Sequence, residues 1–137
     1  MSDVIDISLT ADATALARIE GALEAFAEQH GLAPKAAYGL SLVVEELVTN
    51  IVKYGYGDGA PGPVWLAVRL EDGSIVGTLT DAGIAFDPTG MDTPDVDAEM
   101  DERHVGGLGV HLVRTLAEEF AYHRDGDRNV VTFRLAA

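Results

Sequence analysis

The sequence has 137 residues, a length that fits one domain with a sizeable core. Nine Lys and Arg against 23 Asp and Glu give a net charge of −14, which argues against direct binding to nucleic acid or anionic lipid, because both are held through Lys and Arg. The absence of cysteine excludes disulfides and thiolate metal sites. No apolar run is long enough to cross a bilayer and the first residues lack a leader pattern, so we expect a cytoplasmic protein that does not bind membranes.

The first part of the chain predicts a strand and two helices. Residues 4–9 alternate apolar and polar side chains, as an opening strand does. A helix is predicted over 13–29, ending before Gly31, because apolar residues recur there at three- and four-residue steps: Leu16, Ile19, Leu23 and Phe26. A second helix is predicted over 34–54, and its first residue, proline, suits a first helical turn.

The centre of the chain predicts a hairpin followed by a long loop. Residues 55–63 are rich in Gly and Pro, and the apolar segments 64–70 and 74–80 flank the turn sequence Glu71-Asp72-Gly73. Residues 81–107 show no sustained periodicity. So long a loop in a compact domain is usually a lid or a binding loop, and this is the first indication of function.

The last part of the chain predicts a helix and two strands. Helical spacing resumes at Val110 and continues through Leu112, Val113, Leu116 and Phe120. Strands are predicted near 120–124 and 129–135, around Asp125-Gly126-Asp127. The order β-α-α-β-β-lid-α-β-β predicts an α+β fold of one domain over 1–137: a two-layer sandwich with a mixed, mostly antiparallel sheet and helices on one face.

The second predicted helix has a polar half that carries Glu46, Asn50 and Lys53 along one stripe, opposite an apolar half. An amide oxygen together with phosphate oxygens suits Mg²⁺, which prefers hard oxygen ligands. A nearby carboxylate can accept a proton from an attacking hydroxyl. The stripe therefore suits a metal-bound phosphate, although, taken alone, it is better explained as the solvated face of an ordinary amphipathic helix.

Two further segments carry residues suited to a nucleotide. Asp81 and Gly83 follow an apolar strand, so a carboxylate able to accept a hydrogen bond from an amine lies beside a residue that permits close approach; a plain strand-to-turn exit is the alternative. Gly106-Gly107-Leu108-Gly109 precedes the helix that begins near Val110, where free N–H groups favour phosphate. The segment could equally be a hinge, and it matches neither the P-loop nor the dinucleotide fingerprint.

Taken in order, three segments resemble the N, G1 and G2 boxes of the GHKL ATPase superfamily, which includes DNA gyrase, MutL and sensor histidine kinases: "EELVTNIVKYGY", "TDAGIAFDP" and "GGLGVHLV". Among its branches the chain most resembles the small anti-sigma-factor serine kinases of the RsbW and SpoIIAB type. The resemblance covers nearly the whole chain and implies the Bergerat fold, with ATP and Mg²⁺ as cofactors.

The resemblance implies a role for each matching residue. Glu46 would be the general base, Asn50 the Mg²⁺ ligand, and Lys53 a neighbour of the phosphates. Asp81 would accept the adenine amine and Gly83 would line the base pocket. The phosphates would lie on the glycine-rich segment beneath a lid over about 87–105, contacted by Gly107, Leu108 and Gly109.

The match departs from the family pattern at several positions. Tyr54 stands where these kinases usually have His, and Arg128-Asn129-Val130 replaces a Gly-Asn-Thr type turn. Thr132, in the last predicted strand, remains a candidate pocket residue. The lid has Arg103 and His104 but no basic residue directly before the glycines, so the cation for the γ-phosphate is not identified.

The function implied by the resemblance is that of a protein serine/threonine kinase acting as an anti-sigma factor. Its partners would be a sigma factor and an anti-anti-sigma (STAS-like) protein, Arg18 on the first helix would face a partner, and the protein would be a homodimer. The alternative is a nucleotide-binding regulatory module that sequesters a partner without transferring phosphate. A histidine kinase catalytic domain is disfavoured, because the four histidines lie outside any helical hairpin that could present a phosphoacceptor.

Overall fold

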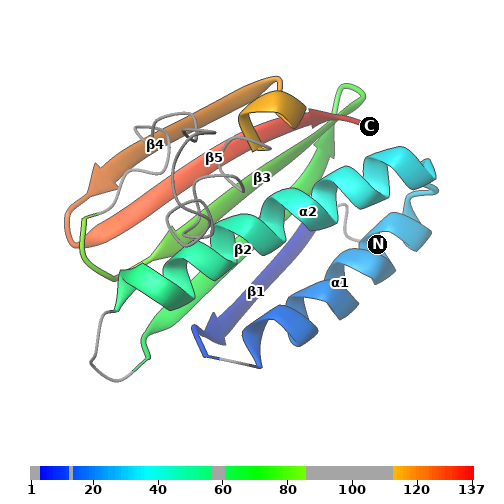
Figure 1. Cartoon of the computed structure of the whole chain (residues 1–137). Helices are drawn as coiled ribbons and strands as arrows, with labels where there is room; N and C mark the ends of the chain where they lie inside the picture. The colour runs from blue at the N-terminus through cyan, green and yellow to red at the C-terminus, as the bar shows by residue number, and fades with distance from the viewer. Residues whose placement is uncertain (1–3, 13, 57–60, 86–112) are drawn as a thin grey trace, which may run out of the picture.

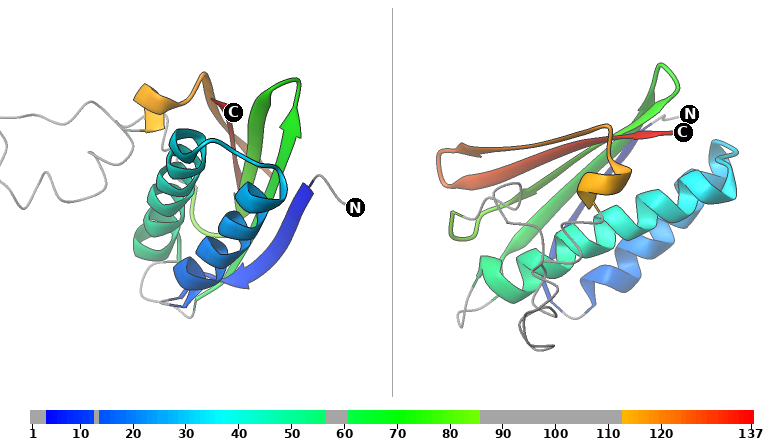
Figure 2. Two further views of the ribbon diagram at one scale, coloured as in Figure 1. Left: turned by 90° about the vertical axis from the view of Figure 1, so that its right-hand side faces the viewer. Right: turned by 45° about the horizontal axis from the view of Figure 1, so that its top comes forward.

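The computed structural model describes residues 4–12, 14–56, 61–85 and 113–137 and shows an α+β fold of two layers (Figure 1). Two α-helices cover one face of a five-stranded sheet, as the edge-on view in Figure 2 shows. The elements in chain order are β1 (Val4–Thr10), α1 (Ala15–Gln29), α2 (Pro34–Asn50), the π-helix η1 (Ile51–Gly55), β2 (Pro63–Glu71), β3 (Ser74–Asp81), β4 (Glu119–Asp125) and β5 (Arg128–Ala136).

The five strands have the order β1-β2-β3-β5-β4, and every neighbouring pair is antiparallel. The antiparallel character was predicted, but the described strands contain no parallel pair, so the sheet is not mixed in this part of the chain. Because β5 lies between β3 and β4, the last residue of β3 is opposite the second residue of β5: Asp81 pairs with Asn129. This crossover brings two polar residues far apart in sequence to one end of the sheet.

Tight turns close both hairpins where the sequence predicts them. Between β2 and β3, Asp72 has φ 51° and Gly73 has φ 80°. Two central residues with positive φ form the type I′ turn, whose twist matches that of paired strands, and Asp-Gly is a favoured sequence for it. Between β4 and β5, Asp125 pairs with Arg128, and Gly126 has φ 60°.

Alternation along the strands separates a helix-facing side of the sheet from an open side. In β5 the buried residues are Asn129, Val131, Phe133 and Leu135, whereas the intervening side chains face away from the helices. At Gly77 of β3, a Cβ atom would lie 2.1 Å from Cζ of Phe133, so only glycine leaves room for that ring across the strand. The rest of the core between sheet and helices is apolar, with Ile19, Leu23 and Phe26 from α1 and Leu40, Val43, Val44, Leu47 and Val48 from α2.

The second helix changes form at its C-terminal end. The sequence predicts one helix over 34–54, but the α-helix ends at Asn50 and a π-helix continues over Ile51–Gly55. A π-helix widens each turn by one residue, and such segments are frequent at functional sites. Periodicity over five residues cannot distinguish the two helix types, which is why the sequence did not reveal the change.

The helix predicted from Val110 to Phe120 is shorter than expected at its C-terminal end. Residues 113–116 are helical, and Ala117 N–H donates to Val113 O at 2.8 Å. Glu118 N–H then donates to Arg134 O at 2.7 Å, which returns the chain to the sheet. Phe120 therefore belongs to β4, opposite Phe133, and packs against the core as a strand residue.

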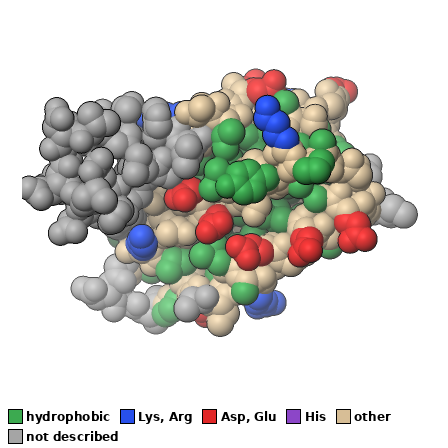
Figure 3. Space-filling view, turned by 45° about the vertical axis from the view of Figure 1, so that its right-hand side comes forward, with side chains coloured by type: hydrophobic (Ala, Val, Ile, Leu, Met, Phe, Trp, Pro, Cys, Tyr) green, Lys and Arg blue, Asp and Glu red, His purple; other side chains and the backbone are tan. Residues whose placement is uncertain are grey.

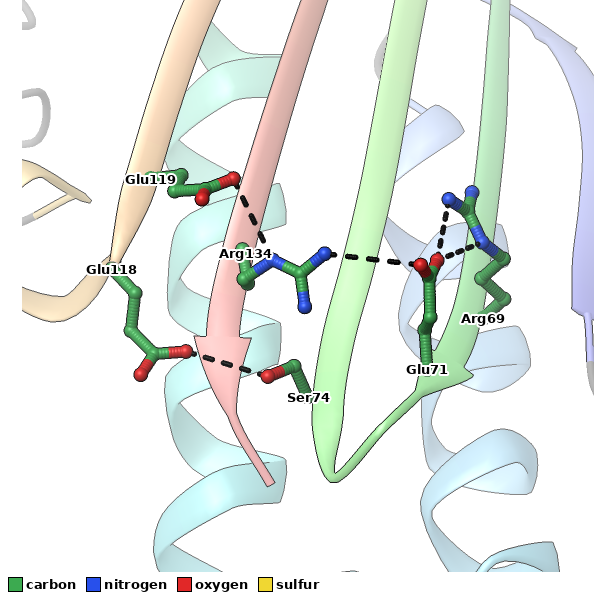
Figure 4. Close-up of polar contacts among 6 residues, drawn as sticks. All are labelled: Arg69, Glu71, Ser74, Glu118, Glu119 and Arg134. Atoms are coloured by element: carbon green, nitrogen blue, oxygen red, sulfur yellow. Dashed lines mark hydrogen bonds and ion pairs between the residues drawn. The ribbon is translucent and has the colours of Figure 1, made fainter.

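In the part of the chain that the structure describes, the open side of the sheet carries ion pairs (Figure 4). Arg134 lies between Glu119, at 3.5 Å, and Glu71, at 4.0 Å, and Arg69 pairs with the same Glu71 at 2.8 Å. Further along, the Arg128 guanidinium lies 4.5 Å from the Trp65 ring centroid. No helix in the described part of the chain is long and apolar enough to cross a membrane.

Candidate functional site

Asn50, the last residue of α2, has the most unusual environment among the buried polar side chains. Its side chain is 3% exposed, and within the described residues neither Nδ2 nor Oδ1 has a hydrogen-bond partner. An unsatisfied buried amide costs about 1–3 kcal/mol. A residue retained at that cost is a strong candidate for a role that the unliganded protein does not show.

Asn50 lines a cavity at the end of the sheet where β3 stops and β5 begins. The cavity is about 20 Å³, room for one water molecule, so these residues form the floor of a site rather than the whole of it. Its lining combines three polar residues, one from each surrounding element, with an aliphatic wall: Asn50, Asp81 and Asn129 with Leu47, Ile51, Leu79 and Val131.

Asp81, the last residue of β3, is 5% exposed and is held by two donors. Gly83 N–H donates to its Oδ1 at 2.8 Å, and Asn129 Nδ2 donates to the same oxygen at 3.0 Å. Among the described residues, no hydrogen bond to Oδ2 is recorded, which leaves that oxygen as the acceptor for an amine. Gly83 is buried beside it, so the structure brings together these two predicted residues.

Asn129 is the residue that the sequence analysis did not assign to the site. Its Nδ2 also donates to Ile84 O at 2.7 Å, and its Oδ1 accepts from Tyr122 Oη at 2.7 Å and from Arg124 Nη1 at 3.1 Å. Arg124 Nη1 donates to Gly83 O at 2.9 Å as well. The alternation of the last strand could have indicated that Asn129 is buried, because it occupies a helix-facing position in phase with Val131, Phe133 and Leu135.

Glu46 lies one helical turn before Asn50 on α2, half-buried. Burial raises the pKa of its carboxyl group above the usual value, and the negative charge of Glu45 raises it further, whereas Lys53 acts in the opposite direction. A raised pKa makes the ionised carboxylate a better proton acceptor. Lys53 is exposed on η1, near enough to Glu46 to influence its charge.

The described part of the structure does not place any of the remaining predicted residues at this site. Thr132 is a correction: it lies between Val131 and Phe133 on the opposite, open side of the sheet, paired with Thr78. Strand alternation imposes that orientation. Arg18 is exposed on α1 and does not line the cavity. Outside the described residues lie Gly107, Leu108, Gly109, Arg103, His104 and the lid predicted over about 87–105.

The residues present fit a nucleotide with a hard metal ion. Asn50 offers an amide oxygen that accepts no hydrogen bond from the described residues, and Mg²⁺ binds such oxygens together with phosphate oxygens and water. The described residues contain no cluster of three or more His, Asp or Glu able to hold a metal by themselves. A metal here would therefore need ligands from the phosphates, with the protein contributing one oxygen.

Comparison with known proteins identifies the family of this domain. Residues 9–135 match the model of the histidine kinase-like ATPase domain family. The chain is 27% identical over 131 residues to the serine/threonine-protein kinase BtrW of Bordetella bronchiseptica, covering 96% of this chain and 91% of the relative. It is 24% identical over 135 residues to the serine-protein kinase RsbW of Listeria monocytogenes, covering 96% and 86%.

Solved structures share the fold. The crystal structure of the RsbU and RsbW domains of Rv1364c from Mycobacterium tuberculosis superposes with a TM-score of 0.71 at 17% identity, over 98% of this chain. This chain spans 32% of the length of that protein. The match to the family model, over residues 9–135, covers nearly the whole chain. Membership of this family implies ATP binding. The chain belongs to the histidine kinase-like ATPase domain family.

Proposed function

We propose that this protein is an ATP- and Mg²⁺-dependent serine/threonine protein kinase that acts in the cytoplasm as an anti-sigma factor. The observation that carries the proposal is Asn50, a buried amide that has no hydrogen-bond partner among the described residues, lines a cavity with Asp81 and lies one helical turn after the half-buried Glu46. The relatives named serine-protein kinases support the same reading, because they match the chain over 96% of its length.

Each side chain has one task in the proposed reaction. The free oxygen of Asp81 accepts the adenine amine, and Gly83 lets the base approach the backbone. Asn50 holds Mg²⁺, which supplies charge neutralisation at the phosphates when bound, and Lys53 adds a positive charge nearby.

Glu46 then removes the proton from the hydroxyl group of a partner serine. The serine oxygen forms a bond to the γ-phosphorus, the bond between that phosphorus and the bridging oxygen breaks, and ADP leaves. The pKa of Glu46 is raised by burial and by Glu45, which favours this proton transfer. Gly107, Leu108 and Gly109 are proposed to hold the phosphates, beneath the lid over about 87–105, on the basis of the sequence resemblance alone.

The partners proposed are a sigma factor and an anti-anti-sigma (STAS-like) protein, with no direct contact to nucleic acid. A net charge of −14 favours a basic partner, and Figure 3 shows acidic side chains in a row across one face of the molecule. Exposed Arg18 is a candidate partner contact. We further propose, on the basis of the sequence resemblance alone, that the protein forms a homodimer.

The test is phosphotransfer from γ-labelled ATP to a purified STAS-like protein, comparing Glu46→Ala with the neighbouring control Glu45→Ala. Loss of the general base should reduce transfer by about 10²- to 10⁴-fold while ATP binding persists. The control should retain transfer, because Glu45 influences only the pKa of its neighbour. Equal transfer by Glu46→Ala contradicts the base assignment.

Calorimetry separates the kinase from its alternative. ATP binding without any phosphoprotein, across the candidate partners, would identify a sequestering module instead of a kinase. No heat with ATP and Mg²⁺ from the folded protein would overturn the nucleotide site as a whole.

A further inference from the structure

Tyr56 connects the helical side of the proposed site to the strand side. It directly follows η1 and is half-buried. Its hydroxyl donates a hydrogen bond to the backbone oxygen of Pro63, the first residue of β2, and accepts one from Ala82 N–H at 2.8 Å. One phenolic oxygen therefore joins the end of the helix, the beginning of β2 and the first residue after β3.

The ring of Tyr56 lies directly against Gly62, where any side chain would clash with it. A Cβ atom on Gly62 would lie 2.1 Å from Cε1 of the ring, so the ring covers the bare backbone of Gly62. That backbone is itself anchored, because Ala11 N–H donates to Gly62 O at 2.8 Å, next to the end of β1. The ring is thus seated against a fixed surface, and the hydroxyl has a defined place.

Tyr56 holds Ala82, the residue between Asp81 and Gly83. Ala82 N–H points to Tyr56, and the next N–H, of Gly83, points to Asp81 Oδ1. Movement at Ala82 would therefore alter the hydrogen bond that orients the carboxylate. Asn129 and Arg124 hold the same turn from β5 and β4, so the Tyr56 hydroxyl is its contact from the helical side.

The hydroxyl remains a donor under ordinary conditions. Burial raises the pKa of Tyr56 above its usual value, and the charge of Asp81 raises it as well, against a lowering by the Ala82 hydrogen bond. The protonated form can make both hydrogen bonds at once, donating to Pro63 and accepting from Ala82.

We propose that Tyr56 is a positioning residue for recognition of the nucleotide base: its hydroxyl fixes the turn at 82–83 so that Asp81 Oδ2 faces the exocyclic amine of adenine. The inference rests on the proposed function, because it takes Asp81 as the acceptor of that amine. It adds a residue from the end of the helix to the strand residues Asp81 and Asn129, which hold the turn at 82–83 from the sheet side.

The experiment measures binding of ATP and of purine riboside triphosphate, which lacks the 6-amino group, to the wild-type protein and to Tyr56→Phe. The variant keeps the ring on Gly62 and removes both hydrogen bonds. We expect ATP affinity to fall about 3- to 10-fold, with little change for the analogue, so that discrimination shrinks by the same factor.

Two further variants and one ligand-free measurement complete the test. Tyr38→Phe removes a hydroxyl from a side chain that is 70% exposed on α2 and should change neither affinity. Gly62→Ala should displace the ring and reproduce the loss of discrimination. Hydrogen exchange at Ala82 N–H should be faster in Tyr56→Phe without nucleotide, because its acceptor is gone.

The outcomes separate the two claims. Unchanged discrimination in a folded Tyr56→Phe protein, or an equal loss for both nucleotides, would overturn the role of Tyr56 and leave the kinase proposal intact. Absence of ATP binding by the wild-type protein would overturn both.

Discussion

The two ends of the interface between α2 and the sheet differ in the polarity of their buried side chains. Toward the end where β5 finishes, the interface is aliphatic and aromatic, with Phe133, Ile75 and Leu40 each 1% exposed or less. Toward the end where β3 finishes, the same layer contains Asn50, Asp81 and Asn129, all 5% exposed or less. One helix and two strands pass from the first region into the second without a break.

The difference shows how stability and function share one layer. The apolar end gains free energy from burial, at about 25 cal/mol per Å² of apolar area. At the polar end, Asn129 Nδ2 donates a hydrogen bond to Asp81 Oδ1, whereas the Asn50 amide has no hydrogen-bond partner among the described residues. The apolar end thus stabilises the fold, and the unsatisfied amide at the other end is a local cost that a ligand can remove.

The largest stability effect is expected at the apolar end. Phe133→Ala should lower the free energy of unfolding by about 3–5 kcal/mol, because it leaves a cavity beneath β3 that Gly77 cannot fill. Urea denaturation measures the loss. The control is Thr132→Ala on the open side of the same strand, where a change within about 0.5 kcal/mol is expected. Equal losses would mean that the two sides of β5 do not differ in packing.

At the polar end we expect the opposite sign. Asn50→Leu should raise the free energy of unfolding of the nucleotide-free protein by about 1–3 kcal/mol, because it removes a buried amide that has no hydrogen-bond partner among the described residues. It should also weaken Mg²⁺-dependent ATP binding. Denaturation and calorimetry measure the two effects on one sample.

The matched control for Asn50→Leu is the reverse exchange one turn earlier. Leu47→Asn introduces an amide at a position that is 2% exposed and lines the same cavity, so it should destabilise the protein by at least about 2 kcal/mol. Destabilisation by both variants would show that Asn50 is a structural residue.

The sequence predicted much of the fold because periodicity records which side of an element is buried. The strand alternation at 64–70 and 74–80 and the helical spacing of α1 correspond to β2, β3 and α1 in the structure. Phe120 was included both in the helical spacing and in the strand predicted near 120–124, because an apolar residue four positions after Leu116 fits a helix as well as it fits the beginning of a strand. The structure assigns it to β4, where it is paired across the strands with Phe133.

The site was predicted only where a motif carried it. Asp81 and Gly83 are brought together, whereas Thr132 was chosen for its hydroxyl group without regard to its side of the strand. Asn129 and Tyr56 were missed because their contacts join residues 48 and 26 positions apart. Such contacts depend on the strand order β3-β5-β4, which local spacing does not specify.

A smaller effect is expected on the pH dependence of phosphotransfer. The pKa of Glu46 is raised, so its ionisation opposes folding as the pH rises through that pKa, and the acid limb of the rate profile lies above the usual range for glutamate. Lys53→Gln removes the charge that lowers this pKa and should move the limb to higher pH. Glu45→Gln should move it to lower pH. Profiles of kcat/KM measure both shifts, and a shift in the same direction for both variants would contradict the cause assigned.

The smallest effect is expected on the open side of the sheet, where the charged side chains are solvated. Arg134 and Glu119 lie 3.5 Å apart, with side chains 29% and 74% exposed. An ion pair so exposed gains little from Coulomb attraction and costs side-chain entropy, so a double-mutant cycle with Arg134→Ala and Glu119→Ala should give a coupling of about 0.2–1 kcal/mol. The coupling should fall as salt is added. A value above about 2 kcal/mol, insensitive to salt, would mean that the pair is shielded from water in solution, as it would be if a second copy of the chain covered this side of the sheet.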